Sequence, residues 1–189
     1  MTRIIAGEAR GRRLRGSVGT ATRPTSDRVR EALISALDAR LGTLTGIRFL
    51  DVFAGSGAVG LEAASRGAEA VTMIEADRGT AASARANLRQ LRLGGVTVIA
   101  AKAESQAAGP PPTAPFDVAF FDPPYEWPAA RLGQLVADMA GNGWLQPGAM
   151  VVVERSRRDR DWVWPPSVEP LQSKRYGETM LWYGRLSSG

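Results

Sequence analysis

The segment Asp122-Pro123-Pro124-Tyr125 has residue types that suit the binding of an aromatic amine. Two consecutive prolines stiffen the backbone and remove two N–H donors. Asp122 and the Pro123 carbonyl then offer two acceptors at one point, which matches an amino group that has two hydrogens to donate. The ring of Tyr125 offers a face on which an unpaired base can stack. These four residues are the candidate catalytic residues.

A glycine-rich segment, Asp51 to Gly60, contains the pattern Gly-X-Gly-X-X-Gly directly after an apolar run. Glycines let a backbone turn tightly and approach a ligand, and a helix N-terminus favours an anionic group. Glu75 ends the next apolar run, 15 residues after Gly60. A carboxylate at such a position commonly accepts hydrogen bonds from ribose hydroxyls. Together the two features predict either a dinucleotide or another adenosine cofactor.

The elements that must position these motifs alternate along the chain. Nearly continuous apolar runs predict buried parallel strands, and the segments between them have the pattern of covering helices. The tail, 167–186, is expected to form an antiparallel hairpin. The prediction is an α/β, Rossmann-like fold with a mostly parallel seven-stranded sheet, in which ligands bind beyond the carboxyl ends of the strands. The remaining strands are expected at 47–53, 70–75, 96–100, 116–121 and 149–154, and helices at 27–41, 58–66, 78–91 and 129–140.

Positive charge is concentrated at the N-terminus. Residues 1–30 hold eight arginines and two acids, a net of +6, whereas the other 159 residues carry 16 bases and 17 acids. Arginine contacts phosphate in a bidentate manner, so the clustering indicates a nucleic-acid partner. Short alternating runs predict a small β-hairpin arm over 1–20, followed by the main domain over 21–189. The candidate RNA contacts are Arg10, Arg12, Arg13, Arg15 and Arg23.

Two residue types are absent, and this narrows the chemistry. The chain has no cysteine and no histidine. That excludes disulfide frameworks, Cys or His zinc sites and Ser-His-Asp triads, and no metal is expected. No apolar run approaches the roughly 20 residues of a membrane helix, and residues 1–7 do not resemble a signal peptide. We expect a cytoplasmic monomer with no membrane partner.

Over nearly its whole length the chain resembles the bacterial 16S ribosomal RNA guanine-N2 methyltransferase family, within the class I S-adenosylmethionine-dependent methyltransferases. The glycine loop and the Asp-Pro-Pro-Tyr motif are shared by many methyltransferases, so the narrow resemblance depends mainly on the first 33 residues. The matching segments are 3–7 with Gly11-Arg12, 23–33, 50–57, 122–125 and 176–179.

The resemblance implies that the domain over 21–189 binds S-adenosylmethionine and methylates a guanine N2 amine of 16S ribosomal RNA, within the assembled or assembling small subunit. Relatives usually carry Asp where this chain has Lys102, which cannot accept a hydrogen bond from the adenine amine. Either Glu104 substitutes, or only the Ala103 N–H remains. The implied cofactor-binding residues are Asp51, Phe53, Ala54, Gly55, Ser56, Gly57, Glu75, Ala76, Ala103 and Glu104.

Other classes of protein also fit some of these sequence motifs. An adenine-N6 methyltransferase acting on DNA or RNA would use the same two acceptors, because its target is also an exocyclic amine. A ribosome-assembly factor that binds RNA and keeps a relic cofactor pocket is a non-catalytic alternative. A nicotinamide-dependent oxidoreductase would share the glycine motif, but it leaves the segment 122–125 unexplained. A protein-glutamine methyltransferase usually has Asn in place of Asp122.

Overall fold

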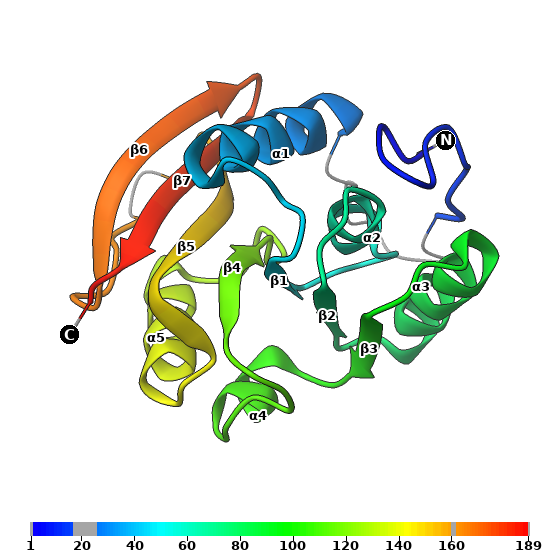
Figure 1. Cartoon of the computed structure of the whole chain (residues 1–189). Coiled ribbons are helices and arrows are strands. Elements are labelled where there is room, and N and C mark those ends of the chain that lie inside the picture. Colours follow the sequence, from blue (N-terminus) through cyan, green and yellow to red (C-terminus); the bar gives the residue numbers. More distant parts are fainter. Residues whose placement is uncertain (1, 17–25, 160–161, 189) are drawn as a thin grey trace. The chain divides into compact units, whose positions relative to one another are not determined.

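The structure, a computed structural model, describes residues 2–16, 26–159 and 162–188 (Figure 1). The chain divides into two compact units, Met1–Ala101 and Lys102–Gly189. Each unit contains part of the strand set with helices packed against it. Among the described residues no helix combines the length and the apolar character needed to span a bilayer.

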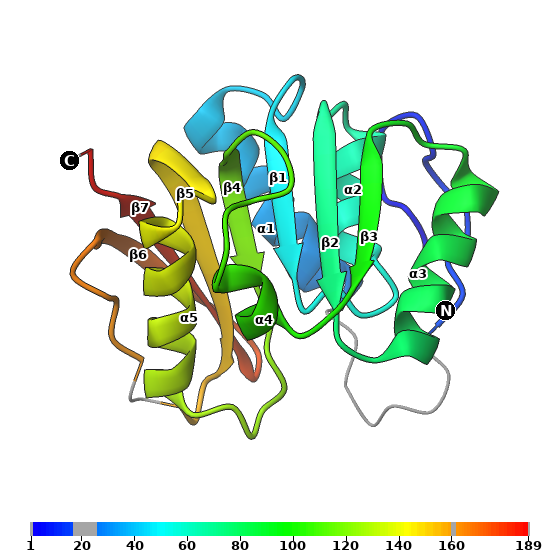
Figure 2. The ribbon, with the colours of Figure 1, turned by 90° about the horizontal axis from the view of Figure 1, so that it is seen from below.

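In the first unit, three parallel strands lie in the order β3-β2-β1. Figures 1 and 2 show α2 and α3 beside these strands, with the N-terminal segment running along both helices. The register pairs Val52 with Ile74 and Glu75 with Ala100, so the carboxyl ends of all three strands lie at one edge. The elements are α1 (Asp27–Leu41), β1 (Arg48–Val52), α2 (Ala58–Ser65), β2 (Ala70–Glu75), α3 (Arg78–Leu91) and β3 (Val96–Ala100).

Local sequence explains where two of these helices begin. The Ser26 hydroxyl accepts a hydrogen bond from the Val29 amide at 3.2 Å and caps α1. Asp77 caps α3, because its carboxylate accepts from the Thr80 amide at 2.7 Å. Hydrogen bonding to Thr80 holds the pKa of Asp77 below its ordinary value.

In the second unit, the strands lie in the order β4-β5-β7-β6. β4 and β5 are parallel, whereas β7 pairs antiparallel with both β5 and β6. Figure 2 shows α5 lying along β4 and β5. The elements are α4 (Ala103–Ala107), β4 (Phe116–Phe121), α5 (Ala129–Gly141), β5 (Leu145–Ser156), β6 (Val168–Tyr176) and β7 (Thr179–Leu186).

The predicted fold class is confirmed, including the parallel strands and the C-terminal antiparallel pair. Two details differ from the expectation. The short helix α4 was not predicted, because its five residues are too few to show a helical period. β5 begins at Leu145 rather than near residue 149, although Pro147 and Gly148 resemble a loop. The irregularity lies on β5, because the register advances from Leu145 to Met150 while β4 advances only from Phe116 to Val118.

The N-terminal segment, residues 2–16, is docked on the first unit rather than extended from it. The expected hairpin is reduced to one antiparallel bridge, between Arg3 and Arg13. Ile4, Ala9 and Leu14 are each at most 3% exposed, so the segment contributes to the core. Residues 17–20, and with them the expected boundary at residue 20, lie outside the described residues.

Candidate functional site

The glycine loop, residues 53–57, connects the end of β1 to the start of α2. Gly55 and Gly57 have φ of +57° and +87°, a region that favours glycine. Phe53 is also left-handed, at +66°, although it carries a side chain. Strained backbone of this kind clusters at ligand-binding and catalytic sites.

Side chains from neighbouring elements fix the shape of this loop. Glu75 accepts from the Gly55 amide at 2.9 Å with one oxygen and from the Asp77 amide at 2.8 Å with the other. Asn87 of α3 donates to the Ser56 carbonyl at 3.0 Å. Each oxygen of Glu75 has a second lone pair, so the carboxylate can position the loop and still accept from a ligand.

Asp51, at the end of β1, is 1% exposed and accepts from the Gly60 amide at 2.8 Å. A Cβ on Gly60 would lie 2.8 Å from the Met73 sulfur, so this third glycine of the motif lets α2 pack closely on β2. Asp51 therefore has a structural partner in addition to the ligand role expected of it.

The loop has the features that an adenosine cofactor with an anionic group requires. The N-terminus of α2 has no side-chain cap, because Gly57 occupies the cap position. A Cβ built on Gly55 meets nothing within 4 Å among the described residues, so the space beside the loop is open. Glu75 ends the neighbouring strand with an exposed Ala76 after it. The residues present thus fit the cofactor: the uncapped N-terminus of α2 suits a carboxylate, and the Glu75 carboxylate suits hydroxyls.

Ala103 and Glu104 begin α4 in the second unit. Ala103 is buried, and the Glu104 carboxylate forms an ion pair with Arg131 of α5. The Arg131 guanidinium also lies 4.0 Å from the ring centroid of Trp127. Glu104 thus already has a cationic partner, and whether it or Ala103 contacts adenine stays a prediction.

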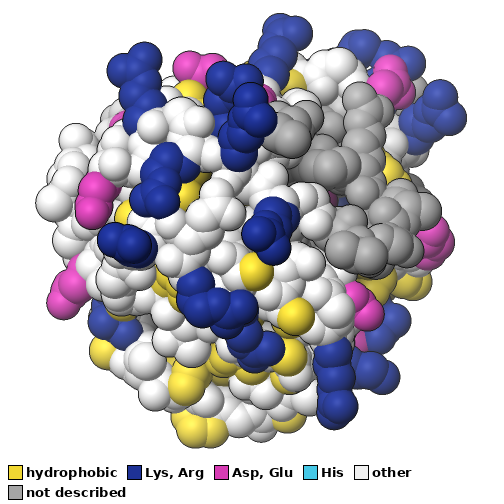
Figure 3. All heavy atoms as spheres, turned by 90° about the vertical axis from the view of Figure 1, so that its right-hand side faces the viewer, with side chains coloured by type: hydrophobic (Ala, Val, Ile, Leu, Met, Phe, Trp, Pro, Cys, Tyr) yellow, Lys and Arg dark blue, Asp and Glu magenta, His cyan; other side chains and the backbone are white. Residues whose placement is uncertain are grey.

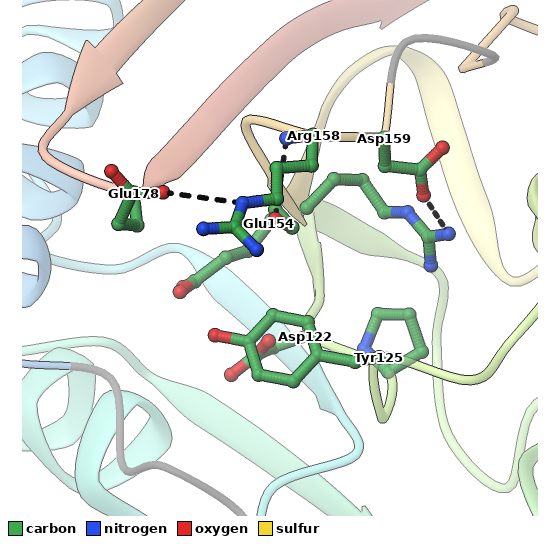
Figure 4. Close-up of a pocket in the computed structure, with 9 residues that line it drawn as sticks. Asp122, Tyr125, Glu154, Arg158, Asp159 and Glu178 are labelled. Carbon is green, nitrogen blue, oxygen red and sulfur yellow. Dashed lines mark hydrogen bonds and ion pairs between the residues drawn. The ribbon is translucent and has the colours of Figure 1, made fainter.

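The second unit contains a cavity of about 520 Å³ beside the Asp-Pro-Pro-Tyr segment (Figure 4). Four carboxylates and two arginines line it, together with the ring of Tyr125. The cavity therefore combines an aromatic face with many hydrogen-bond acceptors. Its lining residues are Asp122, Pro123, Tyr125, Glu154, Arg155, Ser156, Arg158, Asp159 and Glu178.

Strand register brings two carboxylates to this cavity. Phe121 of β4 pairs with Val153 of β5, so Asp122, just after β4, and Glu154, within β5, follow side by side. Tyr125 is 61% exposed, which leaves its ring free to stack on a ligand. The Pro124 carbonyl accepts from the Trp127 amide at 3.0 Å.

Several lining residues were missed in the sequence. Arg155 is 6% exposed, donates to the Trp127 carbonyl at 2.8 Å and pairs with Asp159, so it holds the loop that follows Tyr125. Arg158 lies 3.8 Å from Glu178 in the β6–β7 turn. The rule that ligands bind at strand ends identified Asp122 and applies equally to Glu154, the last residue of the strand predicted at 149–154.

The arginines expected to bind RNA differ in their surroundings. Arg10, Arg13 and Arg15 are exposed on the N-terminal segment. Arg12 is also exposed, but its guanidinium donates to the carbonyls of Leu91, at 2.9 Å, and of Gln90 at the end of α3. Arg23 lies outside the described residues, so the structure adds nothing about it.

The chain matches a known protein family and is similar to known proteins in sequence and in structure. A family model described as conserved hypothetical protein 95 matches residues 2–185. The chain is 39% identical over 152 residues to the ribosomal RNA small subunit methyltransferase D of Escherichia coli K12, covering 80% of this chain and 73% of that protein. The solved structure of a putative methyltransferase from Escherichia coli superimposes with a TM-score of 0.84 at 32% identity, over 99% of this chain and 98% of the other.

A more distant structure shares the fold alone. It is a magnesium protoporphyrin IX methyltransferase from Synechocystis PCC 6803, solved with bound S-adenosylmethionine. The TM-score is 0.66 at 12% identity, over 85% of this chain and 79% of that one. The α/β arrangement is therefore the fold of that methyltransferase.

Proposed function

Because the chain belongs to the conserved hypothetical protein 95 family, in which its relatives include ribosomal RNA methyltransferases, we propose that it methylates the N2 amine of a guanine in 16S ribosomal RNA. The expected family resemblance is confirmed by these relatives, and the cofactor is S-adenosylmethionine. The proposal places a monomeric enzyme in the cytoplasm, acting on the assembled or assembling small subunit.

The cavity beside Asp122 is the observation that favours guanine over adenine as the target base. Guanine presents N1–H and N2–H₂ donors on its Watson–Crick edge, whereas adenine presents an acceptor at N1. Ionised carboxylates only accept hydrogen bonds. Asp122 and Glu154 both line the cavity, so its acceptors complement the donors of guanine (Figure 4). In this proposal Asp122 binds the N2 amine and Glu154 binds N1–H.

The proposed chemistry needs little acid–base catalysis. S-adenosylmethionine supplies an already activated methyl group when bound. The guanine amine is a weak nucleophile, because its lone pair is delocalised into the ring. Asp122 and the Pro123 carbonyl accept its two hydrogens, orient the nitrogen and stabilise the positive charge that develops on it. The proton released afterwards passes to water, and Tyr125 holds the base by stacking, which contributes roughly 1–3 kcal/mol.

On the cofactor side, the glycine loop and two carboxylates have separate roles. The open backbone beside Gly55 approaches the cofactor, and the N-terminus of α2 binds its anionic end. Glu75 accepts from the ribose hydroxyls with the lone pairs that its two backbone contacts leave available. Phe53, Ala54 and Ala76 supply the surrounding surface, and Asp51 holds the loop against α2.

RNA recognition is assigned to the N-terminal segment and the catalytic loops. Arg10, Arg13 and Arg15 bind phosphates, and Arg12 contributes through the N–H groups that its helix contacts leave over. Phosphate contacts give affinity and orientation rather than sequence choice. We therefore expect the small subunit, in which the RNA is already shaped, to be a better substrate than naked RNA.

The test is transfer of a tritiated methyl group from S-adenosylmethionine to small subunits that lack this modification, followed by nucleoside analysis. N2-methylguanosine is the expected product, and Asp122→Ala is the matched inactive control. Labelled N6-methyladenosine would support the adenine-N6 alternative. Binding to subunits without any transfer would support the assembly factor with a relic pocket, and either result would overturn the proposal.

A further inference from the structure

The N-terminal segment and the C-terminal half of α3 form one continuous surface. The Arg12 guanidinium donates to the Leu91 carbonyl at 2.9 Å, and the Gln90 amide donates to the Arg13 carbonyl at 3.0 Å. Asn87 both accepts from the Arg15 amide, at 2.8 Å, and donates to the Arg15 carbonyl, at 3.0 Å. These contacts join residues more than 70 positions apart, so the helix and the segment hold their arginines in a fixed relation.

This surface carries a strong excess of positive charge. Residues 2–16 contain five arginines and one acid, Glu8, whereas residues 78–92 contain four arginines and no acid. Figure 3 looks onto this side of the molecule, where Lys and Arg side chains spread across the face and acidic side chains lie mainly at its margins. We name as the basic face the five exposed arginines Arg10, Arg13, Arg15, Arg89 and Arg92.

The side chains of the five arginines of the basic face form no ion pairs among the described residues. Within the described part of the chain none of the five has a carboxylate partner within 4.0 Å. Arg85 on the same helix differs, because it is half-buried and donates to the Val98 carbonyl at 2.9 Å. The guanidinium groups of the basic face are therefore available for an anionic partner.

The backbone conformation of Arg92 separately indicates that its side chain has a function. It occupies the position after the last residue of α3 with φ of +58°, a left-handed conformation. Glycine is the ordinary residue at this position, since a side chain there strains the backbone. Helix stability by itself therefore favours glycine over arginine at residue 92.

We propose that the basic face binds the phosphate backbone of the ribosomal RNA substrate, with Arg89 of α3 and Arg92 directly after it as contacts additional to those of the N-terminal segment. The inference rests on the proposed function for the identity of the RNA. Guanidinium groups fixed on a docked segment and a helix bind a nucleic-acid backbone without the ordering that a flexible tail would require. The face thus orients the RNA for the catalytic loops rather than reading its sequence.

The experiment compares the full-length protein with Arg89→Ala/Arg92→Ala. The control is Lys174→Ala/Arg175→Ala on β6, which removes the same two charges from exposed positions of the other unit. Binding to unmodified 16S ribosomal RNA transcript is measured at several salt concentrations. Two lost phosphate contacts should flatten the slope of log affinity against log salt by roughly 1.4–1.8 units. The control should keep the slope of the parent protein, and cofactor binding should be unchanged in both.

A second variant, Arg92→Gly, separates binding from folding. Glycine relieves the left-handed backbone, so the melting temperature should stay the same or rise, while the salt slope flattens by roughly 0.7–0.9 units. An unchanged slope in the α3 variants, or an equal loss in the β6 control, would overturn the proposal. If the α3 variants alter RNA binding but the parent protein transfers no methyl group, the proposed function is contradicted, whereas RNA binding by the basic face is still supported.

Discussion

Glu62 and Arg30 form an ion pair in which both side chains are fully buried, with Arg30 Nε 3.5 Å from Glu62 Oε2. Glu62 also accepts from the amides of Ile5 and Ala6, at 2.8 and 3.0 Å. Arg30 donates in turn to the Arg3 carbonyl at 2.6 Å. Part of the arginine-rich N-terminal sequence therefore fastens the N-terminal segment to α1 and α2 rather than facing RNA.

Replacing Glu62 by Ala should strongly destabilise the protein. The change leaves the buried Arg30 with only the half-exposed Asp27 as a carboxylate partner, and it removes the acceptor of two backbone amides. Breaking a buried pair in this way costs about 3–5 kcal/mol. For a chain of this length, that corresponds to a fall of roughly 6–20 °C in melting temperature. The exposed Glu69→Ala is the matched control, and equal shifts in the two variants would show that the buried pair contributes nothing.

S-adenosylmethionine, or its demethylated product, should stabilise the protein, whereas NAD should not. At a ligand concentration a hundred times the dissociation constant, the free energy of unfolding rises by about 2.7 kcal/mol. The melting temperature should then rise by roughly 5–11 °C. Thermal denaturation with each ligand is the measurement, and an equal shift with NAD would contradict the assignment of the glycine loop.

Asp122→Ala should lower methyl transfer by orders of magnitude and leave cofactor affinity close to that of the parent. Asp122→Asn should retain more activity, because its amide oxygen is still an acceptor for the amine. Single-turnover transfer measures the first effect and calorimetric titration of the cofactor the second. Transfer by Asp122→Ala at the parent rate would mean that the segment is structural and that the mechanism is wrong.

Asn87→Ala should weaken the binding of both cofactor and RNA, because one fully buried side chain contacts both the glycine loop and the N-terminal segment. Its amide donates to the carbonyls of Ser56 and Arg15. Loss of a hydrogen bond worth about 0.5–1.5 kcal/mol corresponds to roughly a 2- to 13-fold loss in each affinity. The control is Ser83→Ala on the same helix. Unchanged cofactor affinity in Asn87→Ala would show that the contact with Ser56 does not position the loop.

The cap of α3 should make stability depend on pH in the acid range. Hydrogen bonds from Thr80 hold the pKa of Asp77 below its ordinary value of 3.8. Because the folded-state pKa of Asp77 is lowered, the stability that the cap contributes is complete above the unfolded-state pKa. It is lost as the pH falls through the folded-state pKa. Asp77→Asn should therefore lose less stability than the parent as the pH falls below about 3.8. Urea denaturation at several pH values measures this, and identical profiles would contradict it.

Sequence alone determined the alternation of strands and helices, the glycine loop and the Asp-Pro-Pro-Tyr segment. These features depend on neighbours in the chain: hydrophobic periodicity, glycine at tight turns and the stiffness of Pro123-Pro124. The rule that ligands bind at strand ends then places Asp51, Glu75 and Asp122 at candidate sites from the sequence alone.

Only the tertiary structure decided which distant residues meet. The register of β4 on β5 brings Glu154 to the same cavity as Asp122, and no local pattern encodes that register. The chain also folds so that Arg12 meets Leu91 across 79 positions, and the segment predicted as a small β-hairpin arm is thereby docked on α3. Such contacts depend on the packing of whole elements against one another, and for this reason the roles of Glu62, Asn87, Arg89 and Arg92 appear only in the folded chain.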